Sequence, residues 1–178
     1  AVNDIAAVDT EIIELKTDTE NYQDAINELH WEHFDNLMSQ FESVSNEADN
    51  LIDILSNKDM VDDDGNWTDE GIASLGLYAQ QMENAEMQAK QYEEEIKYLN
   101  KNWQKLGYTE EEYLEKLDEL KDGQYDAVQA YNDTKDAIVD LNKERIDAIK
   151  EGIEEEIEAY EELINKKKEE LDAEKDLY

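Results

Sequence analysis

The segment WQKLGYTEEEY, residues 103–113, decides the fold, because a signal that ends one helix stands directly before a signal that begins the next. Gly107 can adopt the left-handed conformation at the C′ position of a Schellman motif, with Tyr108 packing back on the helix it closes. Thr109 is the expected N-cap of the following helix, and Glu112, three residues later, completes a capping box. So short a connection predicts a tight antiparallel helical hairpin.

Apolar residues that recur in steps of three and four predict helices on both sides of this turn. A first long helix is expected within residues 1–56, an acidic connector across 57–68, and the hairpin, with its long C-terminal helix, within 69–178. The stripe of the first helix comprises Ile5, Val8, Ile12, Leu15, Tyr22, Ile26, Leu29, His33, Leu37, Phe41, Val44, Ala48, Leu51 and Leu55. That of the second comprises Ile72, Leu75, Ala79, Met82, Ala85, Ala89, Tyr92, Ile96, Leu99, Trp103 and Leu106. That of the third comprises Leu114, Leu117, Leu120, Tyr125, Val128, Tyr131, Ile138, Leu141, Ile146, Ile149, Ile153, Ile157, Tyr160, Leu163, Leu171 and Tyr178.

The composition also favours long helices. The 178 residues include no Pro, where average usage gives about nine. Hydrophobic residues make up 39% of the chain, below the roughly 45–50% of an ordinary globular domain. A coiled-coil seam needs only about two apolar residues in seven, so narrow seams suit this balance better than a thick core. We therefore expect an all-α fold, an elongated antiparallel helical hairpin or three-helix coiled-coil-like arrangement.

The formal net charge of −34 limits the partners. Nucleic acids and anionic membranes attract proteins through Lys and Arg, so neither is an expected partner. No apolar run approaches the ~20 residues that cross a bilayer, and no signal peptide opens the chain. An enzyme is not expected, because the chain has no Cys and solvated helix faces do not form the dry pocket that catalysis needs. No cofactor is expected either.

The third helix is longer than the second, so the part after about Leu141 would extend beyond its neighbours. An apolar row on that part is a predicted helix-packing interface, comprising Ile146, Ile149, Ile153, Ile157 and Tyr160. This row would face water unless another chain, or a continuation of this one, covered it. No Pro interrupts the helix, although Gly123 and Gly152 are places where it could kink or fray. The chain is thus expected to be a connecting or self-associating piece of a longer polypeptide.

The connector DMVDDDGNWTDEGIASL, residues 59–75, has the composition of a calcium loop. A calcium-binding helix-loop-helix has oxygen ligands at alternate loop positions and a glycine at position 6. Placing Gly65 at position 6 puts Asp62, Asp64 and Asn66 at positions 3, 5 and 7. These three residues are weak candidate metal ligands.

The two ends of the loop do not fit calcium. Position 1 falls on Met60 and position 12 on Gly71, where a carboxylate is needed. The alternative interpretation is a helix connector, with a turn at Gly65 and with Thr68 as the N-cap of the next helix.

The two histidines, His30 and His33, lie three residues apart in LHWEHFD. Two imidazoles on one helix face can begin a metal site, but zinc proteases use H-E-x-x-H or H-x-x-E-H, and this segment is neither. His33 falls on the predicted apolar stripe and is expected to be a packed core histidine.

Several longer stretches resemble a known class of protein. They are DDDGNWTDEGIASLGLYAQQMENA, YEEEIKYLNK, GYTEEEYLEKLDELKDGQYDA and DLNKERIDAIKEGIEEEIEAYEELINKKKEELDAEKDLY. Together they resemble an internal helical region of the long tail tape measure proteins of phages and prophages of Gram-positive gut bacteria. The resemblance covers roughly residue 59 to the end, whereas the first helix is generic.

The resemblance implies a structural role. Tape measure proteins are long, largely helical virion proteins that lie in the lumen of the phage tail tube, set its length during assembly, and leave ahead of the genome. The resemblance also implies tail tube subunits, assembly chaperones and the tail tip as partners, and the host cytoplasm as the place of assembly. A hairpin at Gly107 would fold such a ruler back on itself, so either the isolated segment differs from its state in the tail or this region is not the measuring part.

A second function class stays open from the sequence. The chain has the features of a helical binding module or coiled-coil adaptor, with a weak calcium response through residues 62–68 as one form of it. Calcium titration distinguishes that form, since a shift in melting temperature would have to disappear in Asp64→Ala.

Overall fold

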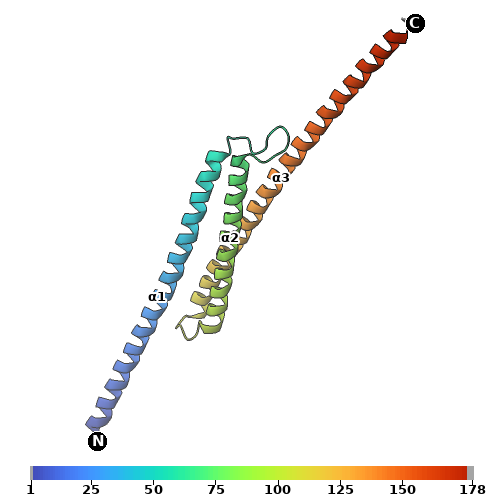
Figure 1. Cartoon of the computed structure of the whole chain (residues 1–178). Helices are drawn as coiled ribbons and strands as arrows, with labels where there is room; N and C mark the ends of the chain where they lie inside the picture. The colour runs from blue at the N-terminus through green and yellow to red at the C-terminus, as the bar shows by residue number, and fades with distance from the viewer. Residues whose placement is uncertain (1, 176–178) are drawn as a thin grey trace. The chain divides into compact units, whose positions relative to one another are not determined.

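The computed structural model describes residues 2–175, and side chains from Val8 onward except at position 9. Within this range the chain forms three helices, α1 (Val2–Leu55), α2 (Asp69–Asn102) and α3 (Glu110–Lys175) (Figure 1). The predicted all-α fold is confirmed. Of the predicted stripe positions, the side chain of Ile5 and the whole of Tyr178 lie outside the described residues.

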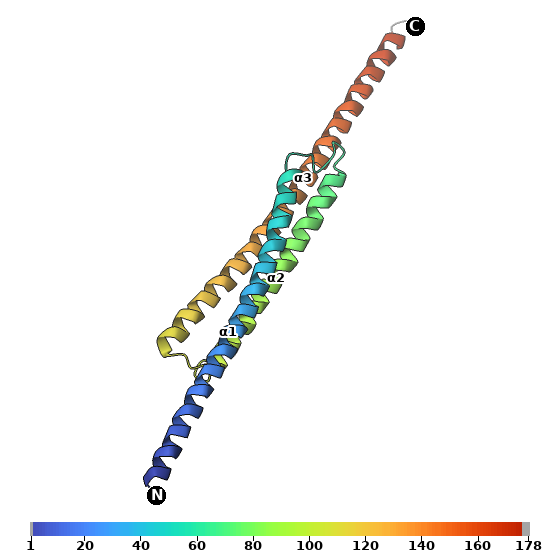
Figure 2. The same cartoon turned by 90° about the vertical axis from the view of Figure 1, so that its left-hand side faces the viewer.

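The helices are divided between two compact units. Unit 1 consists of Ala1–Glu47 and Gln81–Asn132, and unit 2 consists of Ala48–Gln80 and Asp133–Tyr178. Each helix therefore contributes one segment to each unit. In unit 1, the α2 segment runs in the opposite direction to the segments of α1 and α3, as both views show (Figures 1 and 2).

The turn between α2 and α3 forms as the sequence predicts. Gly107 has a φ of 79°, and its N–H donates to the carbonyl of Gln104 at 3.3 Å, while the N–H of Tyr108 donates to the carbonyl of Trp103 at 3.1 Å. These are the two hydrogen bonds of a Schellman motif. The hairpin turn therefore follows from its local sequence.

The capping box at the start of α3 is also present. The N–H of Glu112 donates to the Thr109 hydroxyl at 3.2 Å, and the Glu112 carboxylate accepts the N–H of Thr109 at 2.8 Å. Two donors that the helix itself cannot satisfy are thus paired at its first turn.

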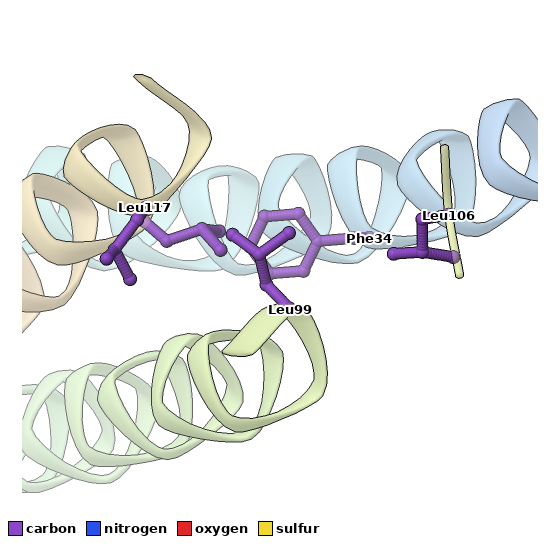
Figure 3. Packing of buried hydrophobic residues seen from close by; sticks show 5 residues of the cluster. Phe34, Leu99, Leu106 and Leu117 are labelled. Carbon is purple, nitrogen blue, oxygen red and sulfur yellow. The ribbon is translucent and has the colours of Figure 1, made fainter. Parts of the chain in front are cut away.

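The core of unit 1 lies beside this turn. Phe34 from α1, Leu99 from α2 and Leu117 from α3 point toward one another, and Leu106 joins them from the turn (Figure 3). Leu120 completes the buried cluster. The ring of Trp103 stacks on Tyr113 with centroids 4.9 Å apart, which covers the end of this core.

The predicted stripe of α1 is wrong in its first half. Tyr22, Ile26 and Leu29 are 73%, 64% and 66% exposed, and the bundle instead buries Asn27 and Phe34. The buried face is displaced by one residue, which is a rotation of about 100° on a helix. This part of α1 has two apolar faces, and the bundle packs on the one with the larger aromatic area.

The same displacement overturns the prediction for His33, which is exposed. The packed imidazole is that of His30, whose ring stacks on Tyr98 at 4.3 Å. Farther along α1, Ala48 is buried as predicted, with 2% of its surface exposed.

Smaller departures occur in α2 and α3. Ile72 is exposed, whereas Ser74, two residues later, is buried. Tyr125 and Val128 are exposed, because α3 turns Ala127 toward the interior of unit 1 instead.

Helix α3 continues through Gly123 and Gly152. Position 123 has no room for a side chain, because a Cβ there would lie 2.3 Å from the Tyr92 ring. The absent side chain therefore lets α2 and α3 approach closely.

Candidate functional site

The connector between α1 and α2 is shaped by the carboxylate of Asp62. Its Oδ1 accepts the N–H groups of Asn66 at 2.7 Å and Asp64 at 3.1 Å, and its Oδ2 accepts the side-chain amide of Asn66 at 3.1 Å. These hydrogen bonds, that from the backbone of Asn66 above all, lower the pKa of Asp62 from its usual value of 3.8. The negative charge thus orders the loop from within.

The candidate calcium ligands are placed close together by these bonds. Asp62 and Asn66 bind each other, with the amide nitrogen of Asn66 turned toward the carboxylate. Among the residues that the structure describes, no group of three or more His, Cys, Asp and Glu side chains is arranged to hold a metal ion. The bonds between Asp62 and Asn66, with the N–H of Asp64, form a turn.

The turn leads directly into α2. Residues Val61 and Trp67 form an antiparallel β-bridge across it. The hydroxyl of Thr68 accepts the N–H of Gly71 at 3.0 Å, which confirms Thr68 as an N-cap. A side chain at position 71 would collide with the carbonyl of Met60, so glycine is needed there.

The connector docks on α3 in unit 2, a contact the sequence analysis did not predict. Nε of Arg145 donates to the carbonyl of Gly65 at 3.0 Å, and its guanidinium lies 5.5 Å from the centre of the Trp67 ring. Gly65 has a φ of 78°, and a Cβ there would lie 2.2 Å from Cγ1 of Ile149. The loop therefore lies directly against α3.

One signal for this contact was present in the sequence. Arg145 is the single arginine of the chain, and Trp67 is the single aromatic residue of the connector 57–68. Arg guanidinium groups stack on aromatic faces and donate in a fixed geometry, which makes such a pair a candidate contact. The sequence does not, however, specify that these two residues contact each other.

A hollow beside this contact is lined mainly by acidic residues. It is lined by Val61, Asp62, Asp63, Glu144, Ala148, Glu151, Gly152 and Glu155. A Cβ on Gly152 would lie 3.5 Å from the carbonyl of Asp63, an ordinary contact distance. Like charges gathered this closely repel one another, so added salt is expected to stabilise unit 2.

The predicted interface row on α3 is only partly covered. Ile149 is half-buried under the connector, which corrects the expectation that the whole row faces water. Ile146, Ile153 and Ile157 are 51%, 52% and 52% exposed, and Tyr160 is 64% exposed. Every residue from 153 to 175 is exposed, including Leu163, Ile164 and Leu171. The α3 row, defined as Ile146, Ile153, Ile157 and Tyr160, is thus accessible to a partner.

The histidines do not form a paired site. Nε2 of His30 lies 2.7 Å from Oε2 of Glu95, a carboxylate that is 7% exposed and that also accepts from Gln91 at 3.0 Å. This contact joins α1 to α2. His33 is exposed and takes no part in it.

A further hydrogen bond joins α1 to the hairpin turn. Nε1 of Trp31 donates to the hydroxyl of Tyr108 at 2.7 Å, and the ammonium of Lys116 lies 4.5 Å from the centre of the Trp31 ring. Burial is the main cause that raises the pKa of the Tyr108 hydroxyl. Tyr108 therefore serves both the turn and the packing of α1.

Among the described helices, none is both long and apolar enough to cross a bilayer. No protein-family model, curated protein or solved structure matches the chain at a significant level.

Proposed function

We propose that this chain is a structural helical segment of a phage tail tape measure protein, with a part in tail length determination and tail assembly. The proposal starts from the resemblance of residues 59–178 to such proteins. It assigns no catalytic residue and no cofactor. The expected partners are tail tube subunits, assembly chaperones and the tail tip, with the tail lumen as the final location.

The observation that best supports the proposal is the α3 row. Ile153, Ile157 and Tyr160 remain at least half exposed on a helix that continues to Lys175. Fully burying one large apolar side chain contributes roughly 1.5–3 kcal/mol. A helix or tube wall laid along this row would therefore gain substantial stability, as a protein that acts by helix packing requires.

A change in the length of this segment tests the role in length determination. A helix adds about 1.5 Å per residue, so an in-frame duplication of residues 133–175 adds at most roughly 65 Å to a ruler. This segment lies outside the hairpin of unit 1. We expect phages that carry the duplication to have longer tails by electron microscopy. Tails of unchanged length would argue that this region does not measure.

A separate measurement tests the structural role itself. Mass spectrometry of purified virions should detect peptides of this chain in the tail fraction. A chain confined to infected cells and absent from virions would contradict the proposal.

The second candidate is a helical binding module or adaptor. The exposed α3 row would equally suit a partner helix outside a virion. Absence from virions, together with a complex formed through Ile153 and Ile157 in the infected cell, would favour this role.

A further inference from the structure

Helix α1 has an apolar seam on the side that faces away from its own bundle. Its members recur in alternating steps of four and three, the spacing of a heptad repeat. They are Val8, Ile12, Leu15, Thr19, Tyr22, Ile26 and Leu29. Each of the apolar members is more than half exposed. We call these seven residues the α1 seam.

The seam and the bundle contact occupy different faces of α1. Taking Val8 as position d of the repeat, Asn27 and Phe34 are b positions and Trp31 is an f position. Around a helix, the mean direction of the b and f positions lies about 150° from the mean direction of the a and d positions. Residues of the former kind pack against α2 and α3, so the α1 seam is free for another helix.

We propose that the α1 seam binds the same seam of a second copy of this chain, as a parallel two-stranded coiled coil. The a positions are Ile12, Thr19 and Ile26, all β-branched, and the d positions are Val8, Leu15, Tyr22 and Leu29, two of them leucine. β-Branched residues at a with leucine at d favour parallel dimers. This inference does not depend on the proposed tail function.

Charge complementarity supports a second copy as the partner. Glu11 is a g position and Lys16 is the e position five residues later, and such residues pair between chains in a parallel, in-register coiled coil. Lys16 is the only Lys or Arg among residues 1–57. A parallel dimer places Lys16 of each chain opposite Glu11 of the other chain. The two-fold symmetry of the dimer gives two such pairs.

The polar residue in the seam can also be buried. The hydroxyl of Thr19 donates to the carbonyl of Leu15 at 2.7 Å within α1. Its donor is already satisfied, so covering Thr19 leaves no unpaired hydroxyl hydrogen. Repulsion between two acidic chains opposes the dimer, but salt at 0.15 M screens exposed charges beyond about 8 Å.

Sedimentation equilibrium of the full 178-residue chain at that salt concentration is the first test. We expect a dimer for the unchanged chain, loss of the dimer in Leu15→Glu, and retention in Ile13→Glu. Leu15 and Ile13 are both 65% exposed, but Ile13 lies at a b position, outside the seam. Circular dichroism should give equal helix content for both variants. A monomeric unchanged chain would overturn the proposal and indicate a different partner, and equal association of both variants would place the contact elsewhere.

Two further sets of variants test the parallel orientation. Lys16→Glu should weaken the dimer, and Glu11→Lys combined with Lys16→Glu should restore it. The chain has no Cys, so Leu29→Cys should form an intermolecular disulfide on oxidation, whereas Glu28→Cys, at a c position, should not. Failure of the double variant to restore the dimer, or an equal yield of disulfide at both positions, would exclude the parallel seam.

Discussion

Nε of Arg145 donates a 3.0 Å hydrogen bond to the carbonyl of Gly65, a residue 80 positions earlier. This bond holds the connector against α3, with the Trp67 ring beneath the guanidinium. Arg145, the single arginine of the chain, thereby attaches the acidic loop to α3, the longest of the described helices. A loop that sequence analysis treats as a passive connector is therefore part of the packing of unit 2.

Gly65→Ala should destabilise the chain more than Gly107→Ala. Both glycines have positive φ, where an L-residue with a side chain costs about 1–2 kcal/mol. At Gly65 the added Cβ also meets Ile149, whereas nothing lies within 4 Å at Gly107. We expect a loss of about 2–5 kcal/mol for Gly65→Ala when this overpacking is added. Chemical denaturation measures both variants, and equal losses would mean that the loop is not seated on α3.

The different outcomes for these two turns show what sequence can predict. The turn at Gly107 was predicted in detail, because its caps and its glycine lie within a few consecutive residues. The seating of Gly65 was not, since it depends on Arg145 and Ile149, and nothing local to the connector specifies them.

Helix α1 shows a second limit of prediction from sequence. Its periodicity correctly predicted a helix, but it has two apolar faces, and the wrong one was assigned to the bundle through Tyr22 and His33. The periodicity of apolar residues gives their spacing along the helix, but it does not show which face of the helix packs against the bundle. Only the partner surfaces of α2 and α3, with Leu99 and Leu117 facing Phe34, select the face that is buried.

His30→Ala should lower the free energy of unfolding by about 1–3 kcal/mol, because a buried hydrogen-bonding group that loses its partner incurs a desolvation penalty of that size. The affected group is Glu95, which is 7% exposed and would retain only Gln91. His33→Ala is the matched control on the same helix. Since His33 is exposed, its loss should change stability by less than about 0.5 kcal/mol. Equal effects in thermal melts would contradict the assigned contact.

Glycine-to-alanine changes should have opposite signs in α2 and α3. Gly76 has nothing within 4 Å of a Cβ, so Gly76→Ala should stabilise the chain by up to about 1 kcal/mol through helix propensity. Gly123→Ala should destabilise it, because the new methyl group overlaps the Tyr92 ring, and overpacking of this kind costs about 1–3 kcal/mol. Stabilisation by both variants would show that α2 and α3 do not approach closely at Gly123.

Glu112→Gln tests the pH dependence of the capping box. Hydrogen bonds from Thr109, its backbone N–H first, lower the pKa of Glu112 below the usual 4.5. A carboxyl group whose pKa is lowered on folding contributes stability above its unfolded pKa, and this contribution is lost as the pH falls through the folded value. The unchanged chain should therefore be more stable than Glu112→Gln at pH 6, and the difference should disappear in stronger acid. Glu111→Gln, in the same helical turn, is the control, and a difference independent of pH would contradict the assignment.

Calcium should stabilise the chain no more than magnesium does at equal concentration. A net charge of −34 attracts any divalent cation, so some rise in melting temperature is expected from both ions through screening alone. A specific calcium site at Asp62 would need the side-chain amide nitrogen of Asn66, which donates to Oδ2 of Asp62, to turn away from the carboxylate. Calorimetric melts with each ion, on the unchanged chain and on Asp64→Ala, separate these effects. A larger shift with calcium that disappears in Asp64→Ala would establish a calcium-responsive connector and favour the binding-module role over a purely structural one.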